Sequence, residues 1–211
     1  MIFGLSSLAS GGAQPMAPDG SNGSAPGVHY AYKASLIGAA HRFELTEEGL
    51  SWHIAGKSGV WPYAGISAIR LSFRPVWMQP HRFRADIERA GQGRIAILST
   101  SWRTAALMVP QDHDYRGFIM QLHARLKQAA SEAALVGGLR PRSYAAAVVL
   151  LALVAIAMAA LVIRAVVTGE WAGALFLLGF AALFGWQIGG FVARNRPRAY
   201  TFDDLPAALL P

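Results

Sequence analysis

The chain has 211 residues, a formal net charge of +7 and a pI of about 10.2. It contains no cysteine, which excludes a lipoprotein anchor, disulfide bonds and thiolate metal sites. Many of its arginines flank two long apolar runs, so the basic charge indicates contact with a membrane surface and no nucleic acid.

Residues 1–28 are rich in glycine, serine, alanine and proline, and they carry Asp19 as their only charge. A segment of this composition buries too little apolar surface to fold, so we expect it to be disordered. Its start lacks the basic residues and the uninterrupted apolar run of a cleaved signal peptide. We therefore expect a linker or an overextended gene start.

Residues 29–138 begin with segments in which apolar and polar residues alternate, which is typical of half-buried strands. In His41–Thr46 and Gly49–Ile54 this alternation surrounds a turn at Glu47–Gly49, which predicts a β-hairpin. Further segments of this kind bring the expected total to about seven strands. These segments are Tyr30–Leu36, Val60–Tyr63, Ile66–Phe73, His81–Arg89 and Arg94–Ser101.

After Pro110 the apolar residues recur every three or four positions, which predicts one amphipathic helix. Asp112 or Asp114 can cap its start, and the pair Gly137–Gly138 would end it. Residues 29–138 thus form an α+β domain that is long enough for a single core. The expected buried face of the helix consists of Tyr115, Phe118, Ile119, Leu122 and Leu126.

Residues 139–198 contain two apolar runs without charge, Ser143–Ile163 and Trp171–Ala193. Each has about the 20 residues that a membrane-spanning helix needs, and we expect helices at about 143–167 and 171–193. The connection between them is too short to hold a domain. The two helices therefore form an antiparallel transmembrane hairpin, and both of its flanks lie on the same side of the membrane.

The flanks of this hairpin carry most of the nearby basic residues, whereas the turn has only Arg164. Basic residues beside spanning helices favour the cytoplasmic side. We therefore expect a multi-pass protein with its domain and both termini in the cytoplasm. The arginines that set this orientation are Arg140, Arg142, Arg194, Arg196 and Arg198.

Small residues form a row on the second predicted helix, at Ala181, Gly185 and Gly189. Such rows let helix backbones approach one another closely. We favour packing within the hairpin over a contact between two copies of the chain, because the short turn already makes the two helices neighbours. The matching row on the first helix is Ala152, Ala155 and Ala159.

The tightest basic cluster of the domain surrounds the loop Pro75–Pro80. A loop that carries a tryptophan beside arginines can insert at the membrane interface, where each basic residue contributes about 1 kcal/mol of attraction to anionic headgroups. The alternative is a solvated strand face with the tryptophan packed on the domain. The candidate headgroup residues are Arg70, Arg74, Trp77, Arg82 and Arg84, with His81 beside them.

The histidines are scattered singly along the chain, and none has the spacing to a second histidine and a glutamate that zinc proteases use. Glu47 and Glu48 are adjacent in a turn, so their carboxylates diverge and cannot act as a glycosidase pair. We expect no metal, no cofactor and no enzymatic activity.

The C-terminal tail, residues 199–211, ends with apolar side chains that follow two acids. An extended peptide of this kind can dock on a sheet edge or groove, either of its own domain or of a partner. The alternative is a frayed terminus. The side chains that would dock are Tyr200, Phe202, Leu205, Leu209 and Leu210.

The passage Trp61–Ile69, the run of short strands and the single closing helix together resemble the pleckstrin-homology-like (PH-like) domains of small bacterial membrane proteins. In those proteins such a domain is joined to a pair of spanning helices. The resemblance covers Tyr30–Gly137 and the general layout of the hairpin. It implies a half-open antiparallel β-barrel, plugged at one end by the helix and used for binding and assembly. This chain departs from the commoner layout, because its domain precedes the helices.

Together these features predict a membrane-anchored PH-like module of the bacterial inner membrane that acts in binding or scaffolding. The expected partners are the lipid bilayer, anionic phospholipid headgroups, and an unidentified membrane protein or a second copy of the chain. The alternative is a membrane-embedded enzyme, or a subunit of one, that acts on a lipid-derived substrate.

Overall fold

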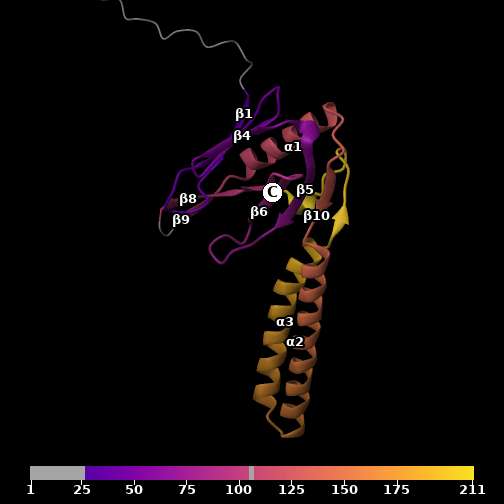
Figure 1. The fold of residues 1–211 in the computed structure, drawn as a ribbon. Helices are drawn as coiled ribbons and strands as arrows, with labels where there is room; N and C mark the ends of the chain where they lie inside the picture. The colour runs from indigo at the N-terminus through magenta and orange to yellow at the C-terminus, as the bar shows by residue number, and fades with distance from the viewer. Residues whose placement is uncertain (1–26, 105–106) are drawn as a thin grey trace, which may run out of the picture.

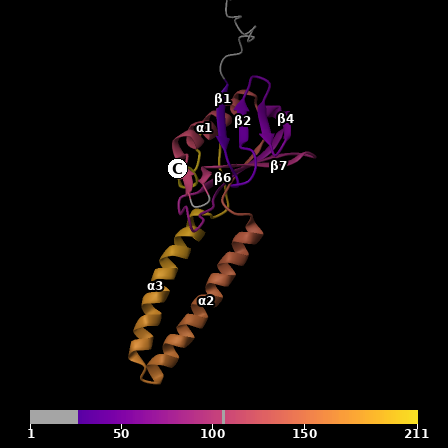
Figure 2. The same cartoon turned by 90° about the vertical axis from the view of Figure 1, so that its left-hand side faces the viewer.

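The computed structural model describes residues 27–104 and 107–211, so nearly all of the segment that we expected to be disordered lies outside the described residues. The described part consists of a domain of strands and one helix, which lies at one end of a hairpin of two long helices (Figure 1). The two hairpin helices spread apart toward the domain (Figure 2). The α+β class and the pair of apolar helices after the domain are confirmed.

The first sheet is an antiparallel meander with the strand order β1-β2-β3-β4. Its inward side chains include Tyr30, Tyr32 and Phe43, as the alternation predicted. The turn between β3 and β4 consists of Ala55 and Gly56, both with positive φ, as a type I′ hairpin turn requires. The strands are β1 (Val28–Tyr32), β2 (His41–Leu45), β3 (Leu50–Ile54) and β4 (Lys57–Trp61).

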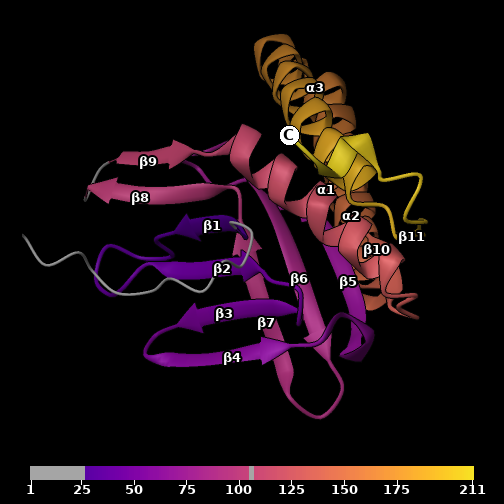
Figure 3. The ribbon, with the colours of Figure 1, turned by 90° about the horizontal axis from the view of Figure 1, so that it is seen from above.

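The second sheet has the strand order β11-β10-β5-β6-β7, and its strands run across the direction of the first sheet (Figure 3). Ile69, Leu71 and Phe73 on β5 face the core, as the alternation predicted. β10 pairs with β5 in parallel, and the other neighbours are antiparallel. The strands are β5 (Ile66–Phe73), β6 (Phe83–Arg89), β7 (Gly93–Leu98), β10 (Ala134–Gly137) and β11 (Arg198–Ala199).

The expected number of about seven strands is too low, because the described residues form eleven. β8 (Thr100–Thr104) and β9 (Leu107–Pro110) make a separate hairpin, and β10 and β11 extend the second sheet. The sequence did not predict β8 as a strand of its own, because the predicted strand Arg94–Ser101 includes its start. The other missed strands, β9, β10 and β11, have only two to four residues, too few for a period to be visible in the sequence. Among the described residues the sheets do not close into a barrel.

Helix α1 (Asp112–Gln128) packs against both sheets through its apolar face. The ring of Phe118 lies 5.6 Å from that of Tyr30 and 6.5 Å from that of Phe43, measured between centroids. The predicted buried face of this helix is confirmed, since all its members are at most 1% exposed. They are Tyr115, Phe118, Ile119, Leu122 and Leu126.

The two ends of α1 differ from the prediction. The N-cap residue is Gln111, so neither Asp112 nor Asp114 caps the helix, and both lie in its first turn. There they interact favourably with the helix dipole. The helix ends at Gln128, well before Gly137–Gly138. The first glycine of this pair belongs to β10, which pairs with β5.

Helices α2 (Pro141–Val167) and α3 (Trp171–Arg194) are 27 and 24 residues long, and both are long and apolar enough to cross a membrane. Their large apolar side chains lie on the outside, with Leu150 63% and Phe176 72% exposed. A core helix of a soluble domain would bury such residues. Length and exposure together therefore favour a lipid environment for the hairpin.

The small-residue row does not bring the helices into close contact along its whole length. Ala181 and Gly185 do line an apolar groove of about 430 Å³ between α2 and α3. A Cβ atom added at Gly185 or Gly189 would nevertheless meet nothing within 4 Å. These two glycines belong to the half of α3 nearer the domain. The two helices have spread apart there (Figure 2), and packing at these two positions stays a prediction.

The C-terminal tail lies against its own domain, which was one of the two predicted alternatives. Leu209 is fully buried and Leu210 is 6% exposed, and both belong to the domain core. Arg116 on α1 donates a hydrogen bond to the carbonyl oxygen of Pro211 over 2.7 Å. The tail thus contributes to the core on the side of the domain that α1 covers.

Candidate membrane-facing site

A buried asparagine joins the domain to the end of α3. The Asn195 side chain accepts a hydrogen bond from the backbone N–H of Phe73 at 3.0 Å and donates one to its carbonyl oxygen at 2.9 Å. Asn195 therefore completes the backbone hydrogen bonding of the last residue of β5. The backbone N–H of Leu139 donates to the Asn195 carbonyl oxygen at 2.9 Å, so the start of α2 is held at the same point.

A glycine makes this joint possible. Gly138 has a φ of +84°, and a Cβ atom there would lie 2.5 Å from the carbonyl oxygens of Asn195 and Arg196. Any other residue would both clash and strain the backbone. Its N–H donates to Leu71 on β5 over 2.7 Å. The hairpin is thus bonded directly to β5, which fixes the side of the domain that faces the membrane if the hairpin spans it.

The outward side of the second sheet carries a cluster of arginines around one buried acid. We call the four arginines Arg70, Arg74, Arg84 and Arg94 the arginine face. Asp86, only 3% exposed, is the acid at its centre. Asp86 accepts hydrogen bonds from Arg84 at 2.9 and 2.7 Å, and the Arg94 Nε atom lies 3.7 Å from it. Among the described residues, Asp86 is thus the one buried carboxylate near these four arginines, and Glu88, the next acid on the same face of β6, pairs with Arg140.

The excess of positive charge affects Arg74 most clearly. Although much of its side chain is exposed, burial of the remainder lowers the pKa of this guanidinium, and the neighbouring Arg84, Arg94 and Arg70 lower it further. Asp86 opposes the shift. Repulsion of this kind is relieved when an anion binds between the arginines.

Arg70 has buried donors that no described residue satisfies. It lies opposite Asp86 in the pairing of β5 with β6, yet its Nε and Nη1 atoms have no hydrogen-bond partner among the described residues. The same is true of Nε of Arg82. A buried donor without a partner costs about 1–3 kcal/mol, and more when it is charged. A phosphate oxygen would supply the missing acceptor.

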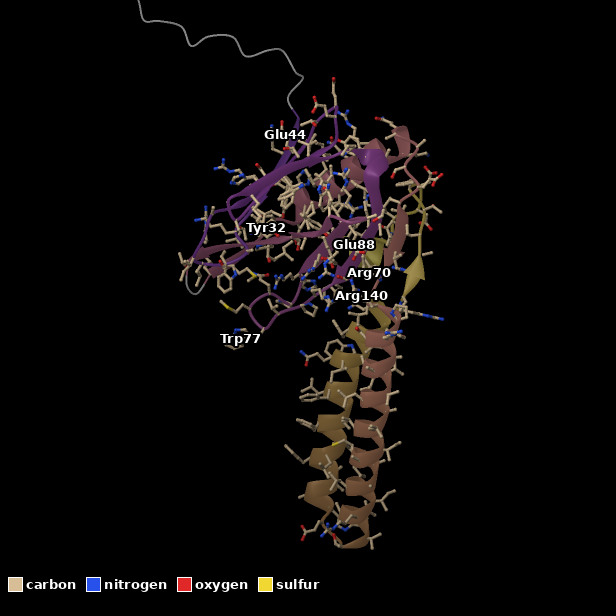
Figure 4. All side chains as sticks on the ribbon, in the orientation of Figure 1. Tyr32, Glu44, Arg70, Trp77, Glu88 and Arg140 are labelled. Carbon is tan, nitrogen blue, oxygen red and sulfur yellow. The ribbon has the colours of Figure 1, made fainter. Side chains whose placement is uncertain are left out.

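The loop between β5 and β6 exposes Trp77 almost completely. Two hydrogen bonds between the backbones of Val76 and Gln79, at 3.0 and 2.9 Å, close the loop into a tight turn with Trp77 at its tip. The Trp77 side chain is 96% exposed, so it does not pack on the domain as the alternative prediction required. Figure 4 shows Trp77 on the side of the domain from which the hairpin leaves.

The flanking arginines gather at the domain end of the hairpin. Arg140 reaches Glu88 on the second sheet at 3.4 Å, and Figure 4 shows both near Arg70, above the hairpin. The Arg194 guanidinium lies 5.1 Å from the centre of the Phe73 ring. The other three flanking arginines, Arg142, Arg196 and Arg198, are exposed.

The sequence identified part of this site. The structure brings Arg70, Arg74 and Arg84 together, as predicted, and places Arg82 beside Arg84. Arg94 and Asp86 were not among the predicted site residues. Asp86 lies two residues after Arg84 on β6, so the alternation of that strand already put the two side chains on one face. Only the register of β6 with β7, which pairs Glu88 with Arg94, brings Arg94 to within 3.7 Å of Asp86.

No protein-family model, no curated protein and no solved structure matches this chain. What the fold and the site define is therefore a class: an α+β domain bonded to a hairpin of two helices that are long and apolar enough to cross a membrane.

Proposed function

We propose that this chain is a membrane-anchored binding module of the bacterial inner membrane, whose arginine face binds anionic phospholipid headgroups of the same membrane. The observation that carries the proposal is the group of four arginines around one buried acid, Asp86, with unsatisfied donors on Arg70. This group belongs to the sheet that is bonded directly to the hairpin.

The distribution of charge supports a cytoplasmic domain. Five arginines lie at the domain end of the hairpin, whereas Arg164 and Glu170 are the charged residues at the opposite end of the described helices. Basic residues favour the cytoplasmic side, where anionic lipids also attract them. The proposed orientation therefore brings the arginine face and the anionic lipids to the same side.

The order of elements supports a PH-like domain. Four antiparallel strands, three more in a crossing sheet and the helix α1 follow one another as the resemblance implies. The hairpin β8–β9 and the strands β10 and β11 are additions to that layout. A scaffolding role for the exposed surface of the domain is part of the proposal. No contact among the described residues favours the alternative of an enzyme acting on a lipid-derived substrate.

The proposal is tested with a probe at the loop tip. Since the chain has no cysteine, Trp77→Cys gives a single site for an environment-sensitive fluorophore. In nanodiscs that contain phosphatidylglycerol, we expect the fluorophore to report an apolar environment. In nanodiscs of phosphatidylcholine alone, we expect it to report a more polar environment. Neutralising Arg70 and Arg74 to glutamine should weaken this insertion by about 1 kcal/mol for each residue.

The matched control neutralises two exposed basic residues of the first sheet, Arg42→Gln with Lys57→Gln. Combined with the labelled Trp77→Cys, this control should show the same insertion of the fluorophore as labelled Trp77→Cys alone. Equal fluorescence in both kinds of nanodisc, or an equal loss in the control, would show that the arginine face does not bind anionic headgroups.

A further inference from the structure

A second site lies beside the arginine face, in a groove between the domain and α3. The groove has a volume of about 710 Å³ and is lined from both sides. Phe73, Pro75 and Pro80 line it from the domain, and the last three turns of α3 line it from the hairpin. The main apolar side chains of α3 in the groove are Leu183, Trp186 and Phe191.

The chemistry of this groove changes along its length. Leu183, Trp186 and Ile188 make its part along the hairpin mainly apolar, with Gln187 as the polar side chain of α3 there, and Trp186 is 81% exposed. At the domain end the lining includes His81 and Arg194. Arg194 is stacked over the ring of Phe73 and makes no ion pair within the described residues. One end of the groove thus suits a hydrocarbon chain and the other an anion.

The position of the groove identifies its occupant. If α3 crosses the membrane, its domain end lies at the headgroup layer, because the basic flank begins there at Arg194. The groove then opens to the bilayer, so water does not fill its apolar part. A molecule from the cytoplasmic leaflet with acyl chains and a negative headgroup matches both ends of the groove.

We propose that this groove holds a single anionic phospholipid, with an acyl chain along Leu183 and Trp186 and its phosphate beside Arg194 and His81. The inference rests on the membrane insertion in the proposed function, but on different residues from the arginine face. The lipid would lie between the loop of β5–β6 and α3 and would connect the domain to the hairpin in addition to Asn195.

Two variants test the two ends of the groove separately. Arg194→Gln removes the cation. Gly190→Leu places a side chain in the groove and leaves the charge, and a Cβ atom at Gly190 meets nothing within 4 Å. Gly179→Leu is the matched control, because Gly179 lies on the same helix with equal free space but does not line the groove.

The measurement is native mass spectrometry of the full-length protein released from nanodiscs of mixed phosphatidylglycerol and phosphatidylcholine. The unmodified protein and Gly179→Leu should retain a single phosphatidylglycerol. Gly190→Leu and Arg194→Gln should lose it at least several-fold. Unchanged thermal unfolding of the variants in detergent would show that they are folded.

Three other results would overturn the inference. The unmodified protein would retain no lipid, or it would retain phosphatidylcholine as well as it retains phosphatidylglycerol, or both groove variants would retain as much phosphatidylglycerol as the unmodified protein does. Loss of a co-purifying protein in Gly190→Leu, with the lipid unchanged, would assign the groove to a protein partner. Labelling of a cysteine at the turn of the hairpin shows separately whether the chain is inserted in the membrane. A groove that binds no lipid can therefore be distinguished from a chain that does not insert, which would contradict the proposed function.

Discussion

His123 connects α1 to the C-terminal tail by two hydrogen bonds. Its Nδ1 atom lies 2.7 Å from the carbonyl oxygen of Ile119, which can only accept, so Nδ1 carries the proton. Its Nε2 atom, 3.0 Å from the Tyr200 hydroxyl, is then the acceptor. The neutral ring therefore fits both partners, and only 1% of the residue is exposed.

Burial lowers the pKa of His123, and the hydrogen bond to Ile119 opposes this shift in part. The unfolded chain, with an ordinary histidine pKa of about 6.5, binds a proton at a higher pH than the folded protein does. This contribution to stability is thus complete above about pH 6.5 and is lost as the pH falls toward the lowered pKa of the folded protein.

We expect the thermal unfolding midpoint of the protein in detergent to fall between about pH 7 and pH 5. His123→Gln should make this fall smaller, whereas His53→Gln should not, since His53 is exposed. Identical pH dependence in His123→Gln and the unmodified protein would show that His123 does not titrate as its burial implies.

At the scale of elements, the sequence predicted the strands that alternate and the helix with an apolar face. It did not predict β10, which has four residues and pairs with β5 across more than sixty intervening residues. Gly137–Gly138 resembled a helix end, but Gly138 is needed for the close approach to Asn195. Such contacts arise from tertiary structure and leave no periodic signal.

The docked tail gives a prediction at this scale. Because Leu209 is fully buried, Leu209→Ala should lower the free energy of unfolding by about 2–5 kcal/mol. Ala208→Ser, at the exposed neighbouring position, should have little effect. The comparison is made by thermal unfolding and by limited proteolysis of the tail. An equally small effect of both substitutions would mean that the tail is frayed.

For the whole molecule, the proposed function depends on where the domain lies relative to the membrane. The apolar runs predicted both long helices from composition alone, whereas the arginine face required the register of three strands. The bonds of Gly138 and Asn195 to β5 then determine which surface of the domain follows the hairpin. The orientation of the hairpin consequently decides whether the arginine face can meet the cytoplasmic leaflet.

The most direct test is labelling of single cysteines in intact cells with a maleimide that does not cross membranes. Thr168→Cys places a thiol in the turn between α2 and α3, and Glu47→Cys places one in the turn between β2 and β3. We predict that residue 168 is labelled from outside the inner membrane, and that residue 47 is labelled only after the membrane is permeabilised. Labelling of residue 47 from outside, or equal labelling of both, would contradict the cytoplasmic position of the domain.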